Sequence, residues 1–456
     1  MPINSFLYPG AKFIPGYEVA NSCRFDDGSS AYMHKTPGSA GNQIAFTISL
    51  WCKRGTLGTK QTLFSAVNDA NNETECHFET DDTLNFRDNE GGSWMIQKRT
   101  NQVFRDCSAW YHLVFSSVSG TQKIWVNGVE VTSWHTNTNG SGTATWNDDN
   151  VMTVGAKNDG SSPQDYFDGH IAEFVSIDGS TLTPTSFGEF DEDSPRIWKP
   201  KDVSGLTFGT NGFYLDFEDS SNLGNDANGG TDLTEVNLAA TDQATDTPTN
   251  NFATWNPLAY SGKTAMAEGN LQGYGDDDGS QNEGGVATIG VSAGKWFWEN
   301  KISAVGGGAS VGIYPDTTYN TISNVGTELH QGDPSIFYKS DGNKQVDDSA
   351  SSYGDSYTTN DIIGVALNLD DNEIKFYKNG TVQNSGTAIS VTSISPAFYF
   401  PVQAGVTNSS VIGNFGNPPY ANSSSVADEN GYGAFEYAPP SGFLALCSKN
   451  LGSDGG

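Results

Sequence analysis

The stretch DIIGVALNLDDNEIKFYKNGTVQ, residues 361–383, decides the fold of this chain. It contains an apolar segment, a polar turn at Asp370-Asp371-Asn372, a segment with Ile374 and Phe376 on one face, and then Asn379-Gly380. An Asn-Gly pair between alternating segments is the strongest short signal for a β-hairpin, because both residues accept a positive φ. The stretch therefore predicts a central strand followed by two further strands, joined by tight turns.

A segment in the first half of the chain, AWYHLVFSSVSGTQKIWVNGVEV (109–131), has the same order of features. A long apolar strand is followed by a polar turn, a strand with an aromatic residue, Asn127-Gly128 and a short strand. Two similar units in different halves indicate two related β-sandwich domains. The length of 456 residues agrees with this, because it exceeds what one hydrophobic core normally serves.

Period-two alternation continues outward from these units, at 44–52, 167–179 and 294–302. In the first of these segments, Ile44 and every second residue after it fall on one face. No segment gives a convincing amphipathic helix, and only 183–193 predicts a short helical turn, opened by Pro184.

Residues 219–257 are polar and turn-rich, which is typical of a connector. They retain Leu233, Val236, Leu238 and Phe252, so we expect them to pack along the domains. The sequence thus predicts an all-β fold of two tandem antiparallel jelly-roll sandwiches with an irregular connector. The expected boundaries are 1–205 for the first sandwich, 206–257 for the connector, 258–450 for the second sandwich and 451–456 for a frayed tail.

The composition excludes several partners. The formal net charge of −31 repels nucleic-acid phosphates and anionic membrane surfaces. No run of eighteen apolar residues exists, so we expect no membrane insertion. The start, MPINSFLYPGAKF, lacks the pattern of a secretory signal, so we expect synthesis in a cytoplasm without export by that route. The five cysteines show neither metal-site nor disulfide spacing.

The first half resembles the laminin-G/concanavalin-A-like sandwiches that are common in structural proteins of marine bacteriophages. The segments that carry this resemblance are RFDDGSSAYMHKTPGSAGN (24–42), AFTISLWCKRGTLGTKQTLFSA (45–66), SAWYHLVF (108–115), IWVNGVEVTSW (124–134) and YFDGHIAEFVSIDG (166–179). The connector pieces NGFYLDFEDSSNLGNDANG (211–229) and TDTPTNNFATWNPL (245–258) look like those of such phage proteins.

The second half is similar to SPRY domains, which are also concanavalin-like sandwiches. The segments that carry this similarity are GKWFWENKI (294–302), DIIGVALNLDDNEIKFYKNG (361–380), SPAFYFPV (395–402) and NFGNPPYA (414–421). The two resemblances imply a virion protein, but modules of this kind bind glycans, proteins or Ca²⁺, and the fold alone does not choose among them.

Catalytic groups are not evident. A glucanase on a concanavalin-like fold needs paired carboxylates on one strand face, about 5–5.5 Å apart. The nearest pattern is Glu189-Phe190-Asp191-Glu192-Asp193, which follows Pro184 in a turn-like stretch, and we find no strand that offers such a pair. The six histidines are scattered, and His112 has apolar neighbours typical of a packed side chain. We therefore expect no enzymatic activity.

Ca²⁺ is the metal ion that the acidic loops suit, because hard cations bind several oxygen atoms on a bent loop. Laminin-G-like sandwiches often hold one Ca²⁺ at the rim, and no other cofactor is implied. The candidate ligands in the first half are Asp26, Asp27, Asp148, Asp149, Asn158, Asp159 and Asp165. In the second half, GYGDDDGSQNEGG (273–285) offers Asp276, Asp277 and Asp278 without EF-hand spacing.

A glycan site would need exposed aromatic rings beside amides or carboxylates. Trp134 and Trp146 lie in the polar segment SWHTNTNGSGTATWNDDN (133–150), where they either stack on a sugar or cover the mouth of the sandwich. The SPRY-like half would bind through loops at one end. Its candidate residues, in or near loop-like stretches, are Tyr314, Tyr319, His330, Tyr338 and Tyr353.

These observations favour a virion surface protein, such as a tail-fibre, receptor-binding or capsid-fibre component, that binds a host surface glycan or protein without catalysis. Its expected location is the virion, and its expected partners are other virion structural proteins and the host ligand. A homo-oligomer stays open, since no heptad pattern enforces one. The alternatives are a purely architectural head-decoration or scaffold protein, a glycan-degrading enzyme on the same fold, and a bacterial surface adhesin.

Overall fold

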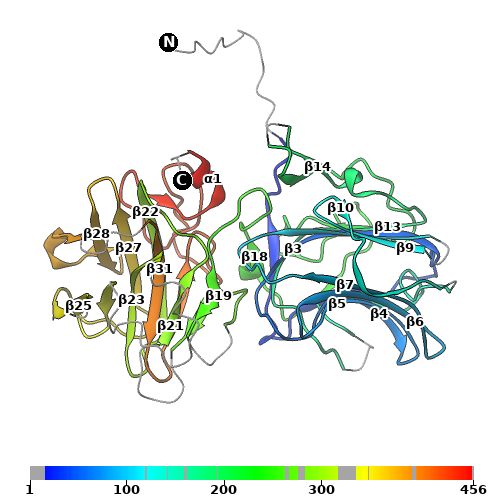
Figure 1. The fold of residues 1–456 in the computed structure, drawn as a ribbon, viewed down its shortest axis with the longest axis horizontal. Coiled ribbons are helices and arrows are strands. Elements are labelled where there is room, and N and C mark those ends of the chain that lie inside the picture. Colours follow the sequence, from blue (N-terminus) through cyan, green and yellow to red (C-terminus); the bar gives the residue numbers. More distant parts are fainter. Residues whose placement is uncertain are drawn as a thin grey trace, which may run out of the picture.

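The chain forms two β-sandwiches that lie side by side (Figure 1). The computed structural model describes residues 16–118, 121–140, 142–158, 162–192, 194–261, 266–275, 283–316, 335–347, 349–392 and 397–453. Strands dominate these residues, so the predicted all-β fold with two tandem sandwiches is confirmed.

The first sandwich consists of two antiparallel sheets, each of eight strands among the described residues. In order across the first sheet, the strands are β10 (Val129–Glu130), β9 (Thr121–Val126), β8 (Tyr111–Val118), β3 (Ala45–Arg54), β13 (Gly169–Asp178), β1 (Ser22–Phe25) and β18 (Gln243–Ala244), with β16 (Phe213–Leu215) beside β13. In order across the second, they are β11 (Trp134–Thr138), β7 (Ser93–Val103), β6 (Thr83–Glu90), β5 (Asn72–Phe78), β4 (Gln61–Asp69), β12 (Val151–Val154), β2 (Tyr32–Lys35) and β17 (Thr234–Val236). A small hairpin of β14 (Gly188–Phe190) and β15 (Trp198–Pro200) stands apart.

Alternation in β3 shows how the core of this sandwich arises. Phe46, Ile48, Leu50 and Cys52 point into the main core, as their period-two spacing predicted. Ile44, predicted on the same face, lies before the strand and is 43% exposed. Its position is explained by the start of the strand at Ala45, where pairing with β8 begins.

The second sandwich is also made of two sheets. Across the first, the strands run β19 (Trp255–Tyr260), β21 (Glu283–Ala287), β31 (Tyr399–Gly405), β23 (Ala309–Pro315), β24 (Ile336–Lys339), β25 (Asn343–Val346) and β26 (Ser349–Ser352). Across the second they run β20 (Gln272–Tyr274), β32 (Ser410–Asn414), β22 (Lys295–Ala304), β27 (Ile362–Asn368), β28 (Glu373–Lys378) and β29 (Thr381–Val382), with β30 (Ile389–Ser390) beside β28 and β33 (Leu444–Ala445) parallel to β22.

The two predicted three-strand units are confirmed as β8-β9-β10 and β27-β28-β29. Asn127 and Asn379 both have a positive φ, and each is followed by a glycine with a positive φ. Each asparagine side chain also accepts a 2.8 Å hydrogen bond from the backbone of the first strand region, at His112 N and Ile362 N respectively. Both sandwiches therefore contain the same Asn-Gly turn, with the asparagine side chain bonded to the backbone of the first strand region.

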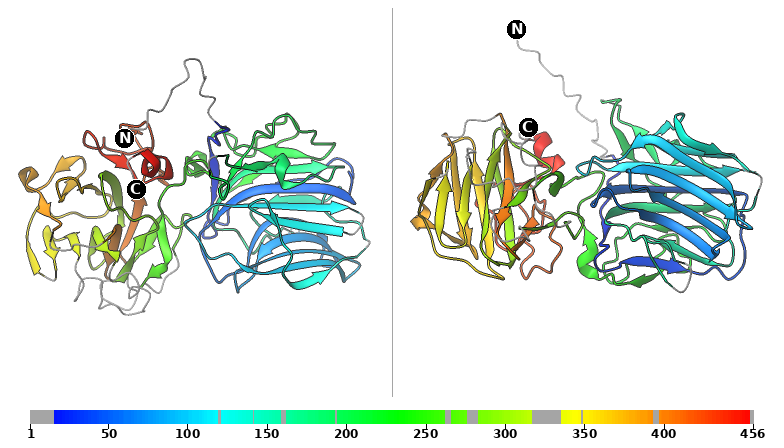
Figure 2. Two further views of the ribbon diagram at one scale, coloured as in Figure 1. Left: turned by 45° about the horizontal axis from the view of Figure 1, so that its top comes forward. Right: turned by 60° about the horizontal axis from the view of Figure 1, so that its bottom comes forward.

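The connector adds strands to the first sandwich and then enters the second. β16, β17 and β18 extend both sheets of the first sandwich, and Leu233 lies in its core. Ala253 and Trp255 already belong to the core of the second. Figure 2 shows from two further directions that the connector region runs between the sandwiches. Residues of this segment therefore lie in the cores of both sandwiches.

Helical structure is sparse among the described residues. Short 3-10 turns occur at η1 (Pro184–Ser186), η2 (Ala240–Asp242) and η4 (Asn384–Gly386), and one helix, α1 (Ser448–Ser453), follows β33. η1 begins at Pro184, where the sequence predicted a helical turn. In this part of the chain no helix is both long and apolar enough to cross a membrane.

Candidate functional site

One face of the second sheet in the first sandwich carries charged side chains. On β5 and β6, Cys76 and Phe86 point into the core, so the alternate residues Glu73, Glu75 and Arg87 lie on the opposite face. Strand register places Glu75 opposite Arg87. We call Glu73, Glu75, Arg87, Lys157 and Trp94 together the Trp94 face.

Ion pairs join the charged members of this face. Arg87 approaches Glu75 Oε2 to 2.5 and 3.0 Å through two nitrogen atoms, and Lys157 Nζ lies 2.6 Å from Glu73 Oε2. Lys60 Nζ is 2.8 Å from Glu75 Oε1, and His77 Nδ1 is 3.1 Å from the same oxygen. The carboxylates are buried, whereas Arg87 and Lys157 stay partly exposed at the surface.

These contacts keep the Glu75 carboxyl ionised. Burial alone would raise the pKa of Glu75, but His77, Arg87 and Lys60 outweigh it and hold the pKa well below its usual value. A hydrogen bond from His77 lowers the pKa of Glu79 to about 2. A glycosidase acid must carry a proton at neutral pH and donate it to the leaving group, and a carboxyl with a lowered pKa does not carry that proton.

The expectation that no strand offers paired carboxylates is wrong, because β5 carries Glu73 and Glu75 on one face. The alternation in NETECHF (72–78) is visible in the sequence. The cations that neutralise these groups come from β6, from the segment before β4 and from the segment after β12. Their proximity arises only on folding.

Trp94 gives this face an exposed ring. It is the second residue of β7, beside Asn89 in register, and its side chain is 40% exposed. The Arg87 guanidinium lies 4.4 Å from the ring centroid. An exposed indole beside amide and guanidinium groups can stack on a sugar ring and hydrogen-bond its hydroxyls. No catalytic role is needed for that chemistry.

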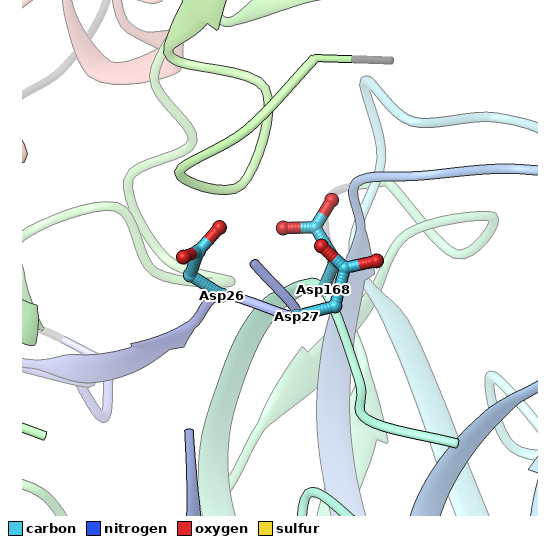
Figure 3. A group of neighbouring side chains, drawn as sticks. All are labelled: Asp26, Asp27 and Asp168. Carbon is cyan, nitrogen blue, oxygen red and sulfur yellow. The ribbon is translucent and has the colours of Figure 1, made fainter. Parts of the chain in front are cut away.

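A second candidate is a cluster of three carboxyls where the first sandwich meets the second. Asp26 and Asp27 follow β1, Asp168 precedes β13, and one oxygen from each lies within 4.8 Å of the others. Figure 3 shows Asp27 and Asp168 close together with Asp26 beside them. Pairing of β1 with β13, which matches Phe25 to Gly169, brings these distant residues together.

The cluster contacts both sandwiches. Asp168 accepts hydrogen bonds from Thr56 N and Oγ1, both at 2.8 Å, and from Gly269 N at 3.1 Å. Asp26 accepts one from Glu268 N at 3.2 Å. Gly269 and Glu268 precede β20 of the second sandwich, so these hydrogen bonds join the two halves.

Crowding of like charges is evident in this cluster. Burial, with the nearby Asp27 carboxyl, raises the pKa of Asp168 to about 7, and burial with Asp26 raises the pKa of Asp27. A bound cation would relieve both effects. Three carboxyls supply the oxygen ligands that Ca²⁺ prefers, so the residues fit that ion. Of these ligands, the sequence predicted Asp26 and Asp27 and missed Asp168, which lies about 140 positions away.

The other predicted metal ligands do not join this cluster. Asp148 accepts a hydrogen bond from Asn150, Asp149 is exposed, Asn158 is buried, and Asp165 pairs with Lys60 at 2.7 Å. Asp159, Asp276, Asp277 and Asp278 lie outside the described residues. Within the described ranges, Asp26, Asp27 and Asp168 form the one group of three potential ligands.

The predicted aromatic ligand residues are mostly part of the cores. Trp146 is fully buried and donates to Ser176 Oγ at 3.1 Å, and Trp134 is half-buried against the core. Tyr314 lies on β23 and Tyr338 on β24, both fully buried, and Tyr353 packs edge-on against Tyr338. Tyr314 and Tyr338, which were expected in or near loop-like stretches, thus lie within strands, one residue before the end of each. Tyr319 and His330 lie outside the described residues.

Two segments match known families. Residues 27–185 match the model of the concanavalin A-like lectin/glucanases superfamily, and residues 295–418 match that of the SPRY domain. The two halves thus contain these domains in the order that the sequence resemblance implied. Both domain types are β-sandwiches, in agreement with the observed fold.

Individual relatives cover smaller parts of the chain. Ran-binding protein 9 of Xenopus tropicalis is 27% identical over 176 residues, which are 36% of this chain and 30% of that protein. The chain thus spans less than a third of that relative's length. Among solved structures, the SPRY domain of human HERC1 is 21% identical over 31% of this chain and 85% of its own, with a TM-score of 0.24.

Another solved structure is domain 4 of an extracellular arabinanase from Geobacillus stearothermophilus in complex with arabinotriose. It is 26% identical and covers 32% of this chain and 66% of its own, with a TM-score of 0.26. TM-scores this low give neither structure any weight in assigning a function to this chain.

Proposed function

We propose that this chain is a non-catalytic binding protein of a virus surface, and that its first sandwich binds a host surface glycan on the Trp94 face. The observation that carries the proposal is the 40% exposed Trp94 ring on a strand face of partly exposed cations. Aromatic stacking with directional polar contacts is how proteins hold sugars. The match of 27–185 to a superfamily that includes lectins supports this choice.

The absence of catalysis belongs to the proposal. Glu73 and Glu75 lie on one strand face like the carboxyls of a glucanase, but each is paired with cations. The lowered pKa of Glu75 leaves no proton to donate at neutral pH. A polysaccharide incubated with the protein should therefore release no reducing ends.

The proposed location on a virus particle rests on the sequence resemblance to phage structural proteins. Immunogold labelling tests it, with antibodies against the recombinant chain and particles purified from the source of the sequence. Label on the particle surface supports the setting, and label confined to host debris contradicts it.

Glycan binding is tested with an array of bacterial surface polysaccharides and with titration of the best ligand. We expect Trp94→Ala to weaken binding by about tenfold or more, because stacking on one ring contributes on the order of 1–2 kcal/mol. Phe398→Ala is the matched control, since it removes another exposed aromatic side chain from the second sandwich.

The outcomes are distinct. If Trp94→Ala and the unaltered protein bind the glycan equally well, the glycan does not bind on the Trp94 face. Absence of binding to every polysaccharide, together with surface label on particles, would favour the architectural role instead.

A further inference from the structure

The outer face of the β22 sheet in the second sandwich contains a hollow. Strand register aligns Asn414, Glu299, Gly364 and Tyr377 across β32, β22, β27 and β28. Gly364 has no side chain, so β27 leaves a space between Glu299 on β22 and Tyr377 on β28. A Cβ at this position would lie 3.1 Å from the Phe297 ring.

A pocket of about 240 Å³ occupies this hollow. Its walls include the rings of Phe297, Tyr377 and Tyr437, and Glu299 lies among its lining residues. Tyr437 comes from the segment between β32 and β33, which crosses this face. Gly380 of the Asn-Gly turn permits the close approach, because a Cβ there would lie 2.6 Å from the Tyr437 ring.

Glu299 is held in place by neutral donors. Its carboxyl accepts hydrogen bonds from Asn414 Nδ2 at 2.9 Å, from Glu436 N at 2.9 Å and from Tyr437 N at 2.8 Å. Among the described residues, no cationic side chain forms an ion pair with it. Burial raises the pKa of this carboxyl to about 7, against the effect of those three donors. The negative charge of its ionised form is thus unneutralised beside an aromatic pocket.

Aromatic faces and a buried carboxyl suit one class of ligand. The negative π-faces attract a cation, and desolvation strengthens that attraction. The carboxylate repels anions at the same place. The same sheet face already shows this contact, with Lys301 Nζ 4.4 Å from the Tyr420 ring centroid. The net charge of −31 adds a field that concentrates cations around the molecule.

We propose that this pocket, lined by Phe297, Tyr377, Tyr437 and Glu299, binds a small organic cation of the alkylammonium class. The site lies in the second sandwich and is independent of the Trp94 face. Its ligand would be a free small molecule or an alkylammonium group on a larger host structure.

Calorimetry on the full chain tests the proposal with matched probes. Choline carries a quaternary ammonium group, and 3,3-dimethyl-1-butanol is its uncharged carbon analogue. We expect saturable binding of choline with one site per chain, at least about tenfold tighter than binding of the alcohol. Equal affinities would show that the pocket recognises shape alone, and no choline binding would overturn the proposal.

Variants locate the binding. We expect Tyr437→Ala to weaken choline binding about tenfold, Tyr437→Phe to retain it, and Glu299→Gln to reduce the preference over the alcohol. Tyr432→Ala is the control, since Tyr432 lies in the same segment and packs on the same cluster as Phe297 and Tyr377 but does not line the pocket. Thermal unfolding shows that each variant is folded. Unchanged binding by Tyr437→Ala, or an equal loss in Tyr432→Ala, would overturn the assignment.

Discussion

Glu173 shows how a single buried carboxyl can set the pH response of the protein. It lies at an irregular position of β13 with φ of 49°, and its side chain accepts hydrogen bonds from Tyr17 Oη at 3.0 Å and Tyr214 Oη at 2.8 Å. Burial outweighs these donors and raises its pKa to about 7. Since the pKa is higher in the folded state, this group stabilises the fold fully below pH ~4.5, and that contribution is lost as the pH rises through 7.

Glu173→Gln should therefore change stability in a pH-dependent way. From pH 5 to pH 8, the free energy of unfolding of the variant should rise relative to that of the unaltered protein. The expected relative rise is on the order of 3 kcal/mol. Urea unfolding at both pH values measures it, with Glu189→Gln as a control at an exposed carboxyl. The same difference at both pH values would mean that Glu173 is ionised in the folded protein.

Residues also show where sequence reasoning reached its limit. Trp146 lies among Asn, Thr, Ser and Gly, so the local pattern left open whether its ring stacks on a sugar or covers the mouth of the sandwich. The partners that bury it, Phe64, Ser176 and Phe213, lie between 30 and 82 positions away in the sequence. Tyr338, expected in or near a loop-like stretch, packs against Tyr357 and Phe376 in the same way. Burial of an isolated aromatic depends on such long-range contacts, which a window of sequence does not contain.

Strands and turns were easier to predict, because their signals are local. The Asn-Gly turns at 127 and 379 specify a backbone shape by themselves, and alternation specifies which face is buried. The connector has neither signal. One of its residues, Asp246, is fully buried and contacts Lys53 and Trp110 of the first sandwich. It also accepts a hydrogen bond from the backbone of Phe252, which packs in a cluster of the second sandwich.

Removing Asp246 should therefore be costly. Lys53 Nζ is 2.7 Å from Asp246 Oδ2, and the Lys53 side chain is 2% exposed. Asp246→Ala would leave this ammonium buried without its carboxylate, which costs about 3–5 kcal/mol. Urea unfolding measures the loss. Asp219→Ala is the connector control, because Asp219 is exposed and, among the described residues, its carboxyl accepts hydrogen bonds from the nearby Ser221. Its effect should stay below about 1 kcal/mol. Similar effects of both variants would contradict the role given to Asp246.

At the scale of the whole molecule, polar contacts hold the two sandwiches together. Arg24 of the first pairs with Glu268 at 3.0 Å and with Asp242 of the connector at 2.8 Å, and Asn270 donates to Gly55 O at 3.1 Å. The sequence predicted both sandwiches but not this junction, since charged residues give no periodic signal of their partners. The same limit hid Asp168 from the set of metal ligands.

The junction makes a sharp prediction about Ca²⁺. Without the ion, Asp27→Asn should raise the melting temperature, because it removes a charge that Asp168 and Asp26 repel. With Ca²⁺, the unaltered protein should have the higher melting temperature. Its free energy of unfolding rises by about 2–3 kcal/mol when the free Ca²⁺ concentration is a hundredfold above Kd, whereas the variant has lost one of the ligands. Thermal unfolding with EDTA, Ca²⁺ and Mg²⁺ measures both effects. An equal Ca²⁺-induced rise in the two proteins would assign the ion to another acidic segment, such as 273–285, and leave Asp26, Asp27 and Asp168 as a contact between the sandwiches.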